Sequence, residues 1–216
     1  DKVGFRDAVS HLLGTPVAEQ PLSAFLSGGS IAHEASPQEF TETTIELIVA
    51  KPLQHPALLA YVQSRGISPA IAQRYSQEVH YLNKGKAFFA VGFANDAGGF
   101  ALRSERFKGN IAPTGYTTIS GPRLATANVF EGFFDFLSAV QLFGSPTNAT
   151  IVLNSTTNVT KALPLLRGFD SLNLYLDRDK AGFDAVARLK KEGLAVFDRS
   201  ARYEGFNDLN QFLVNQ

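Results

Sequence analysis

The chain has 216 residues, 44% of them hydrophobic and 19% charged, which is the composition of a folded protein with a substantial core. Its 20 basic and 20 acidic residues cancel, so any affinity for nucleic acid has to come from local clusters of Lys and Arg. Cysteine is absent, which excludes disulfides and cysteine-ligated zinc within this sequence, and the four histidines are too scattered to suggest a site. With no bilayer-length apolar stretch and no signal-peptide pattern, we expect a cytoplasmic protein that does not act in a membrane.

Residues 1–43 are predicted to hold one short helix and a linker. Apolar residues recur at helical spacing within residues 1–14, and Gly14 is a typical helix stop. The stretch SGGSIAHEASPQEFTET, residues 27–43, is small and polar and cannot bury enough apolar surface to offset its chain entropy. We therefore place a domain boundary after residue 43.

Residues 44–122 are predicted to form a smaller α+β domain. The run TIELIVA (44–50) is typical of a strand, and residues 55–81 have the pattern of two helices separated at Gly66. Ser68 is a predicted N-cap, followed by Pro69 at the first helical position. Residues 86–104 predict two strands joined by an Asn-Asp-Ala-Gly-Gly turn.

The last part of the chain, residues 123–216, alternates between strand and helix patterns. Strands are predicted at residues 126–131, 150–154, 172–177 and 194–198, and helices at residues 133–143, 158–166 and 181–192. This rhythm predicts an α/β fold with a parallel sheet flanked by helices. In such sheets functional groups gather at the carboxyl ends of the strands.

Acidic residues follow two of these predicted strands. Glu131 ends the first strand, and Asp135 lies one helical turn further on. Asp177 and Asp179 end the third strand, so neighbouring strands would bring three or four carboxylates together. Such crowding favours a hard divalent cation, most simply Mg²⁺. The alternative is that Asp177 or Asp179 only caps the helix that follows.

Taken together, the motifs Glu-Gly-x-x-Asp and Asp-x-Asp-x-Ala-Gly, followed by FNDLNQF, resemble the Toprim domain. This is the metal-binding fold shared by bacterial primases, topoisomerases and certain nucleases, and the resemblance covers about residues 124–216. It implies that Glu131 acts in acid–base catalysis and that Asp177 and Asp179 hold Mg²⁺, with Mn²⁺ as a substitute. It also implies that Asp135 is a further acidic residue of the metal site.

The resemblance extends to two further regions. Asp208 matches the first acid of a late acidic pair in primases, but the second position holds Asn210, so one or two metals remain open. Residues 55–75 and 88–109 are similar to the region that precedes Toprim in primase-like proteins of bacterial plasmids and conjugative elements. Residues 1–14 resemble the end of a zinc ribbon, which implies that such a module precedes this sequence.

Basic residues cluster just before the Toprim-like region. They can hold the phosphates of a template or of a nucleotide triphosphate, or they can be ordinary surface residues. We expect a binding role above all for Arg103 and Lys108. The candidate set is Lys84, Lys86, Arg103, Arg106 and Lys108.

The resemblance predicts a DNA primase-like nucleotidyltransferase that makes RNA primers on single-stranded DNA, for the replication or transfer of a mobile element. The implied partners are single-stranded DNA, ribonucleoside triphosphates and a replicative helicase. A Toprim-type nuclease and a non-catalytic nucleic-acid-binding module are the alternatives, and the acidic residues alone do not separate them. A topoisomerase is disfavoured because none of the six tyrosines stands in a recognisable nucleophile setting.

Overall fold

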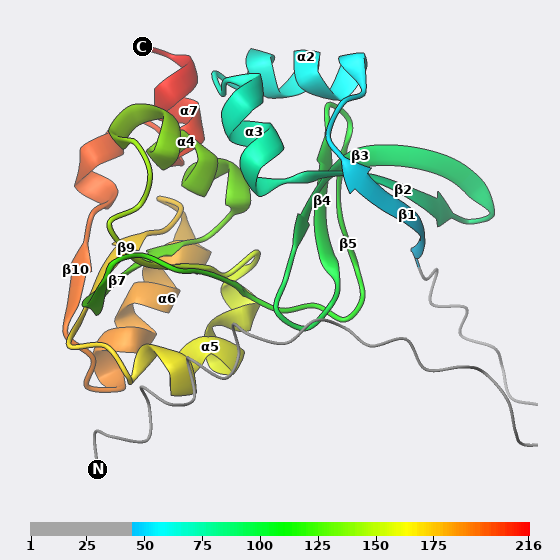
Figure 1. Ribbon diagram of the computed structural model, residues 1–216. Coiled ribbons are helices and arrows are strands. Elements are labelled where there is room, and N and C mark those ends of the chain that lie inside the picture. Colours follow the sequence, from blue (N-terminus) through cyan, green and yellow to red (C-terminus); the bar gives the residue numbers. More distant parts are fainter. Residues whose placement is uncertain (1–44) are drawn as a thin grey trace, which may run out of the picture. The chain divides into compact units, whose positions relative to one another are not determined.

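Two five-stranded β-sheets organise residues 45–216, the part of the chain that the computed structural model describes (Figure 1). The predicted helix in residues 1–14, the linker at 27–43 and the boundary after residue 43 lie outside the described residues. Both sheets belong to a single compact unit of the chain.

The first sheet is antiparallel throughout, with neighbouring strands in chain order. The predicted strand near residue 44 and the predicted hairpin are confirmed. In the hairpin turn, Asn95 Oδ1 accepts hydrogen bonds from the backbone N–H groups of Ala97 and Gly99, and Gly98 adopts a φ of 91°. The strands are β1 (Glu46–Pro52), β2 (Gln77–Asn83), β3 (Lys86–Ala94), β4 (Phe100–Ser104) and β5 (Phe107–Ile111).

Two helices, α2 (Pro56–Ser64) and α3 (Pro69–Tyr75), follow β1, as the sequence predicts. Gly66 has a φ of 73° between them, and the hydroxyl of Ser68 accepts a hydrogen bond from Ile71 N at the start of α3. The prediction that helix continues through residue 81 is wrong, because residues 77–83 form β2. Val79 and Tyr81, both of types enriched in strands, are buried there at alternate positions, and this alternation fits a strand in place of a helix.

The second sheet has the strand order β10-β9-β7-β8-β6 and is mostly parallel, since only β6 runs antiparallel to its neighbour. The prediction of an α/β fold with helix-flanked parallel strands is confirmed with that one modification. The sequence patterns did not indicate β5 or β6, and β6 joins this sheet although it precedes residue 123. The strands are β6 (Thr117–Ile119), β7 (Arg123–Phe130), β8 (Asn148–Val152), β9 (Ser171–Tyr175) and β10 (Val196–Asp198).

Helices cover both faces of the second sheet (Figure 1). The core against α5 and α6 contains Ala127 and Val129 of β7, and the opposite face packs on α4 through Phe130, whose ring lies 5.9 Å from that of Phe136. The helical elements are α4 (Phe133–Phe143), η1 (Thr156–Asn158), α5 (Val159–Leu166), α6 (Lys180–Lys191), η2 (Ser200–Tyr203) and α7 (Leu209–Val214).

Helix α4 also joins the two sheets. The ring of Phe133 stacks on Phe93 of β3 with centroids 5.1 Å apart, and one continuous core contains residues from α2, α3, β3, α4 and β7. Burying each of these phenylalanines contributes about 2–3 kcal/mol. The first turn of α4 is therefore held firmly between the sheets, where the acidic residues lie.

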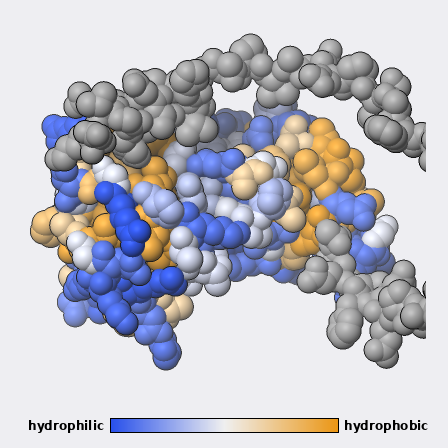
Figure 2. All heavy atoms as spheres, turned by 90° about the horizontal axis from the view of Figure 1, so that it is seen from below, coloured by the Kyte–Doolittle hydropathy of each residue, from blue (hydrophilic) through white to orange (hydrophobic). Residues whose placement is uncertain are grey.

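The surface is not uniformly polar. Figure 2 shows hydrophobic atoms at both ends of the visible face, and Leu47, Ile48 and Val49 of β1 are among the exposed apolar side chains. Across residues 45–216 every helix is too short or too polar to cross a bilayer.

Candidate metal centre

Strands β7 and β9 deliver acidic residues to one edge of the second sheet. The two strands pair directly in parallel, with Phe130 opposite Tyr175, so the chain leaves both strands at the same level. Glu131 Oε2 accepts a hydrogen bond from the backbone N–H of Asp177 at 3.2 Å. The strands that bear Glu131 and Asp177 are neighbours, which is the condition under which the sequence predicts that their carboxylates come together.

Two more carboxylates, at the N-terminal ends of two helices, lie at the same edge of the sheet. Asp135 is buried in the first turn of α4, where its Oδ1 accepts from the backbone N–H of Asn210 at 3.2 Å. Asp208 is the N-cap of α7 and accepts from Gln211 N at 2.6 Å. One carboxylate oxygen from each of Asp135, Asp177 and Asp208 lies within 4.8 Å of the other two. We call these three residues the acidic triad.

The acidic triad carries charge that its protein surroundings do not neutralise. Burial and the nearby Glu131 raise the pKa of Asp177 to about 7, and burial together with Asp208 and Asp177 raises the pKa of Asp135 well above its usual range. Among residues 45–216, none of the salt bridges involves a triad carboxylate. Three oxygen donors at this spacing suit a hard divalent cation such as Mg²⁺ or Mn²⁺, so the residues fit the predicted metal.

Asp179 has a different local role. Its Oδ1 accepts from Gly182 N at 2.9 Å and caps α6, and its side chain lies at the surface outside the acidic triad. Gly182 is required for close packing, because a Cβ there would clash with the carbonyl oxygen of Asp177. Asp179 is still near enough to raise the pKa values of Glu131 and Asp177, and its role as a metal ligand stays a prediction.

The triad opens into a cleft of about 580 Å³ whose walls come from both sheets. Arg103, Arg106 and Lys108, on β4 and β5 and the turn between them, line this cleft together with Glu131. Lys108 is close enough to lower the pKa values of Glu131 and Asp177, which burial and neighbouring acids raise overall. The predicted basic residues thus divide into three that face the acids and two that do not.

Lys84 and Lys86 are the two that lie elsewhere. They occupy the β2–β3 turn and the start of β3, and neither lines the cleft of the acidic triad. Lys84 has a φ of 52° beside Gly85, which is typical of a tight hairpin turn. The structure therefore gives no support for direct binding of phosphates by Lys84 and Lys86 beside the acidic triad.

Asn210 is the site residue whose role the sequence did not indicate. Its Nδ2 donates to the carbonyl oxygen of Arg65 at 2.9 Å and to Ser138 Oγ at 2.8 Å, and its Oδ1 accepts from Arg65 Nε at 2.6 Å. These bonds use the whole amide, and its backbone N–H holds Asp135. Asn210 is therefore a positioning residue that ties the α2–α3 junction to the acidic triad. Only its departure from the acidic pattern marked it in the sequence.

A half-buried guanidinium faces the acids from the first sheet. Arg103 lies over the ring of Phe133 at 5.8 Å and donates to the carbonyl oxygen of Leu102 at 2.8 Å. Burial lowers its pKa, an effect that the negative charges of Asp135 and Asp177 oppose. The cleft therefore holds a partly desolvated positive charge opposite unneutralised carboxylates, an arrangement suited to a bound cation and a phosphate between them.

Comparison with known families places this geometry in a class. Residues 128–213 match the family described as Toprim-like, and residues 47–112 match a family described as Domain of unknown function (DUF8464). No curated protein matches the sequence. The second sheet with its acidic edge is thus a Toprim-like domain, as the sequence motifs predict.

Two solved primases share the fold. The primase fragment of the bacteriophage T7 primase-helicase protein aligns with a TM-score of 0.53 at 16% identity, covering 73% of this chain and 69% of that one. The Aquifex aeolicus primase, with its zinc-binding and RNA polymerase domains, aligns with a TM-score of 0.52 at 18% identity, covering 76% of this chain and 57% of that one. The chain carries a Toprim-like domain and has the fold of primase fragments of the type found in bacteria and phages.

Proposed function

We propose that the protein is a primase-like nucleotidyltransferase that synthesises RNA primers on single-stranded DNA. The observation that carries this proposal is the acidic triad facing Arg103, Arg106 and Lys108 across one cleft. Phosphoryl transfer requires carboxylates that hold a divalent cation and basic side chains that hold the phosphates.

In this proposal Asp135, Asp177 and Asp208 hold Mg²⁺, with Asp179 as a further predicted contributor. The bound ion would neutralise negative charge that develops on the transferring phosphate. Arg103 and Lys108 bind and orient the triphosphate or template phosphates. Glu131, whose pKa burial raises, accepts the proton of the attacking 3′-hydroxyl at its carboxylate.

The likeness to primases supports the wider setting of this proposal. One similar structure belongs to a primase-helicase protein, so a replicative helicase is the partner that we propose here. The other contains the zinc-binding and RNA polymerase domains of a bacterial primase, which supports RNA synthesis as the proposed activity. A role in replication or transfer of a mobile element and a cytoplasmic location remain parts of the proposal.

Primer synthesis tests the proposal directly. The full chain is incubated with single-stranded DNA, the four ribonucleoside triphosphates and Mg²⁺ or Mn²⁺, and the RNA products are resolved by length. We expect synthesis by the parent, loss in Glu131→Gln and Asp177→Asn, and no change in Asp184→Asn, an exposed aspartate of α6.

The products also separate the alternatives. Shortened DNA in place of new RNA would identify a nuclease that uses water in place of the hydroxyl nucleophile. DNA binding without either product would identify a non-catalytic module. Synthesis that survives both the Glu131 and the Asp177 substitutions would contradict the proposed catalytic centre.

A further inference from the structure

A second polar depression lies on the second sheet, away from the acidic cleft. Two adjoining hollows, of about 370 and 560 Å³, share Asn148, Asn173 and Arg199 and so form one groove. The groove crosses the sheet face that carries α4, in the half nearer the amino ends of the strands. We call it the amide–arginine groove, after Arg123, Asn128, Asn148, Asn173, Arg199 and Arg202.

The floor of the groove is an ordered ladder of amides. Asn128 and Asn173 are register partners on β7 and β9, and Asn128 Oδ1 accepts from Asn173 Nδ2 at 3.0 Å and from Asn148 Nδ2 at 3.4 Å. Asn173 Oδ1 accepts from both Nε and Nη2 of Arg199, at 3.0 and 2.8 Å. These bonds fix the amide orientations, and they leave the Asn128 Nδ2 donors and Arg199 Nη1 without a partner among the described residues.

All of the charged side chains that line the groove are positive. Three arginines line it, and none of the residues that line either hollow is acidic. Asp198 precedes Arg199 in the chain, but its Oδ1 accepts from Ser200 N and the residue is not part of the lining. In a chain of zero net charge, a depression with three guanidinium groups, free amide donors and no carboxylate has the chemistry of an anion-binding surface.

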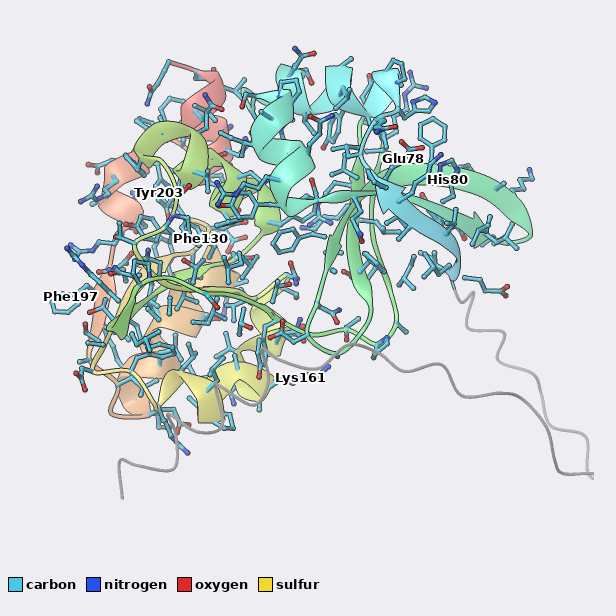
Figure 3. The ribbon with its side chains drawn as sticks, viewed as in Figure 1. Glu78, His80, Phe130, Lys161, Phe197 and Tyr203 are labelled. Carbon is cyan, nitrogen blue, oxygen red and sulfur yellow. The ribbon has the colours of Figure 1, made fainter. Side chains whose placement is uncertain are left out.

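The rim of the groove offers flat apolar surface. Phe197 is 51% exposed on β10, and the guanidinium of Arg199 lies 5.3 Å from its ring centroid. Figure 3 shows Phe197 projecting from the outer edge of the second sheet. Leu124 and Phe143, also exposed, flank the hollows. An exposed aromatic ring beside arginines is the combination that stacks bases while the backbone phosphates are held.

The groove and the acidic cleft are separate sites. They have no lining residue in common, and α4 spans the distance between them, with Asp135 in its first turn and Phe143 at its other end. Eleven helical residues correspond to about 16 Å. A single strand held at both sites would have to pass around α4.

We propose that the amide–arginine groove binds the sugar-phosphate backbone of single-stranded nucleic acid, as a second binding site outside the acidic cleft. Its extent across two hollows favours a polymer over a single nucleotide, and the exposed ring favours a strand with unpaired bases. The choice of nucleic acid among polyanions rests on the proposed function, whereas the anionic preference follows from the lining residues alone.

Binding of a fluorescein-labelled oligo(dT) of about 20 nucleotides to the full chain, measured by anisotropy over a series of salt concentrations in a chelating buffer, tests the proposal. Asn128→Asp keeps the acceptor for Asn148 and Asn173 but places a negative charge where free donors lie. We expect both Asn128→Asp and the double variant Arg199→Gln/Arg202→Gln to weaken oligo(dT) binding about 5-fold or more. The double variant also lowers the slope of log affinity against log salt by about 0.7 for each phosphate that the groove no longer neutralises.

Arg188→Gln provides the matched control, because Arg188 is an exposed arginine of α6 on the opposite face of the sheet. Combining the groove variant with Lys108→Gln should give additive losses, since the two sites are distinct. Equal binding by the groove variants and the Arg188 control would overturn the proposal. So would polyglutamate of matched charge competing as well as oligo(dT), because the partner would then be an acidic protein.

The outcome is independent of catalysis. Oligo(dT) binding should persist in Asp177→Asn, so a failed primer-synthesis assay with intact groove-dependent binding would reject the proposed enzyme activity alone. If the chain makes primers and the groove substitutions leave oligo(dT) binding unchanged, the proposed groove site is rejected and the proposed activity stands.

Discussion

A buried carboxylate, Glu78, and the partly buried acidic triad behave in opposite ways. Glu78, on β2, is only 2% exposed, and its oxygens accept from the backbone N–H of His55 at 2.8 Å and from His80 Nε2 at 2.7 Å, with Lys51 Nζ at 3.2 Å (Figure 3). Although burial by itself raises the pKa of Glu78, these hydrogen bonds and charges outweigh it and lower the pKa to about 2. At the acidic triad, burial and mutual repulsion raise the pKa of Asp177 to about 7.

The two sites differ in the hydrogen-bond donors and cations that the protein itself supplies to the carboxylates. Glu78 finds its donors and cations within the protein and joins β2 to the β1–α2 connection, so its charge is satisfied in the folded chain. The acidic triad has one backbone donor to Asp135 and the helix cap at Asp208, and no salt bridge among residues 45–216. The proposed metal centre rests on this contrast, because a bound cation would supply the positive charge that the triad lacks.

The largest expected effect is on activity at the triad. Asp177→Asn should reduce primer synthesis by about 100-fold or more, because one ligand of the cation is lost. The same change should leave the unfolding free energy of the metal-free protein unchanged or higher, since it removes a repelling charge. Primer yield and urea denaturation of the same preparation measure both. A large loss of stability would mean that Asp177 is a structural residue like Glu78.

Glu78→Gln should show the reverse pattern. Replacing the carboxylate removes the charge that Lys51 and His80 face, and we expect the unfolding free energy to fall by about 2–3 kcal/mol. Because the folded pKa of Glu78 is lowered, its contribution is present above the ordinary pKa of 4.5 and is lost as the pH falls toward 2. Denaturation midpoints at about pH 7 and pH 3 check this, and equal stability of parent and variant at neutral pH would contradict it.

Asn210→Asp tests whether the acidic pair typical of primases can be restored. The new carboxylate would lose the two bonds that Nδ2 donates to Arg65 and Ser138, and it would add charge beside Asp135. We expect the unfolding free energy to drop by about 1–3 kcal/mol, with no gain in cation affinity. Asn215→Asp, near the exposed end of α7, is the control. A variant that is stable and binds a second cation would show that the amide is not needed for positioning.

A smaller effect is expected from pH alone. The folded pKa of Asp177 is raised from 3.8 to about 7, so the folded state binds the proton more tightly than the unfolded chain does. The unfolding free energy of the metal-free protein should therefore fall as the pH rises from about 5 to 8, by about 1–2 kcal/mol. Denaturation in a chelating buffer measures this slope. Saturating Mg²⁺ should abolish it, and a slope of opposite sign would contradict the assigned pKa.

Much of this architecture could be predicted from the sequence, because local patterns determine it. The helix at residues 133–143, the break at Gly66 and the hairpin around Asn95 all depend on periodicity and turn residues within short stretches. The helical pattern that precedes residue 77 predicts helix through residue 81, whereas pairing of residues 77–83 with strands on both sides makes this segment β2. β5 and β6 are short strands that depend on distant partners in the same way.

The acidic residues of the candidate site could be predicted from the sequence, whereas most of the contacts around them could not. Glu131, Asp135, Asp177 and Asp208 follow strands or begin helices, and the sheet order brings them together. The separation of Lys84 and Lys86 from the cleft depends on how the two sheets pack, which the local pattern does not contain. The bonds between Arg65 and Asn210 join residues 145 positions apart, and nothing in either local sequence indicates them.

Cation binding at the acidic triad can be measured by calorimetric titration of the full chain with Mg²⁺ or Mn²⁺. We expect binding that releases protons near pH 7, because the cation displaces them from Asp177. We also expect loss of binding in Asp177→Asn and its retention in Asp184→Asn. Equal binding by the parent and by Asp177→Asn would contradict the proposed metal centre.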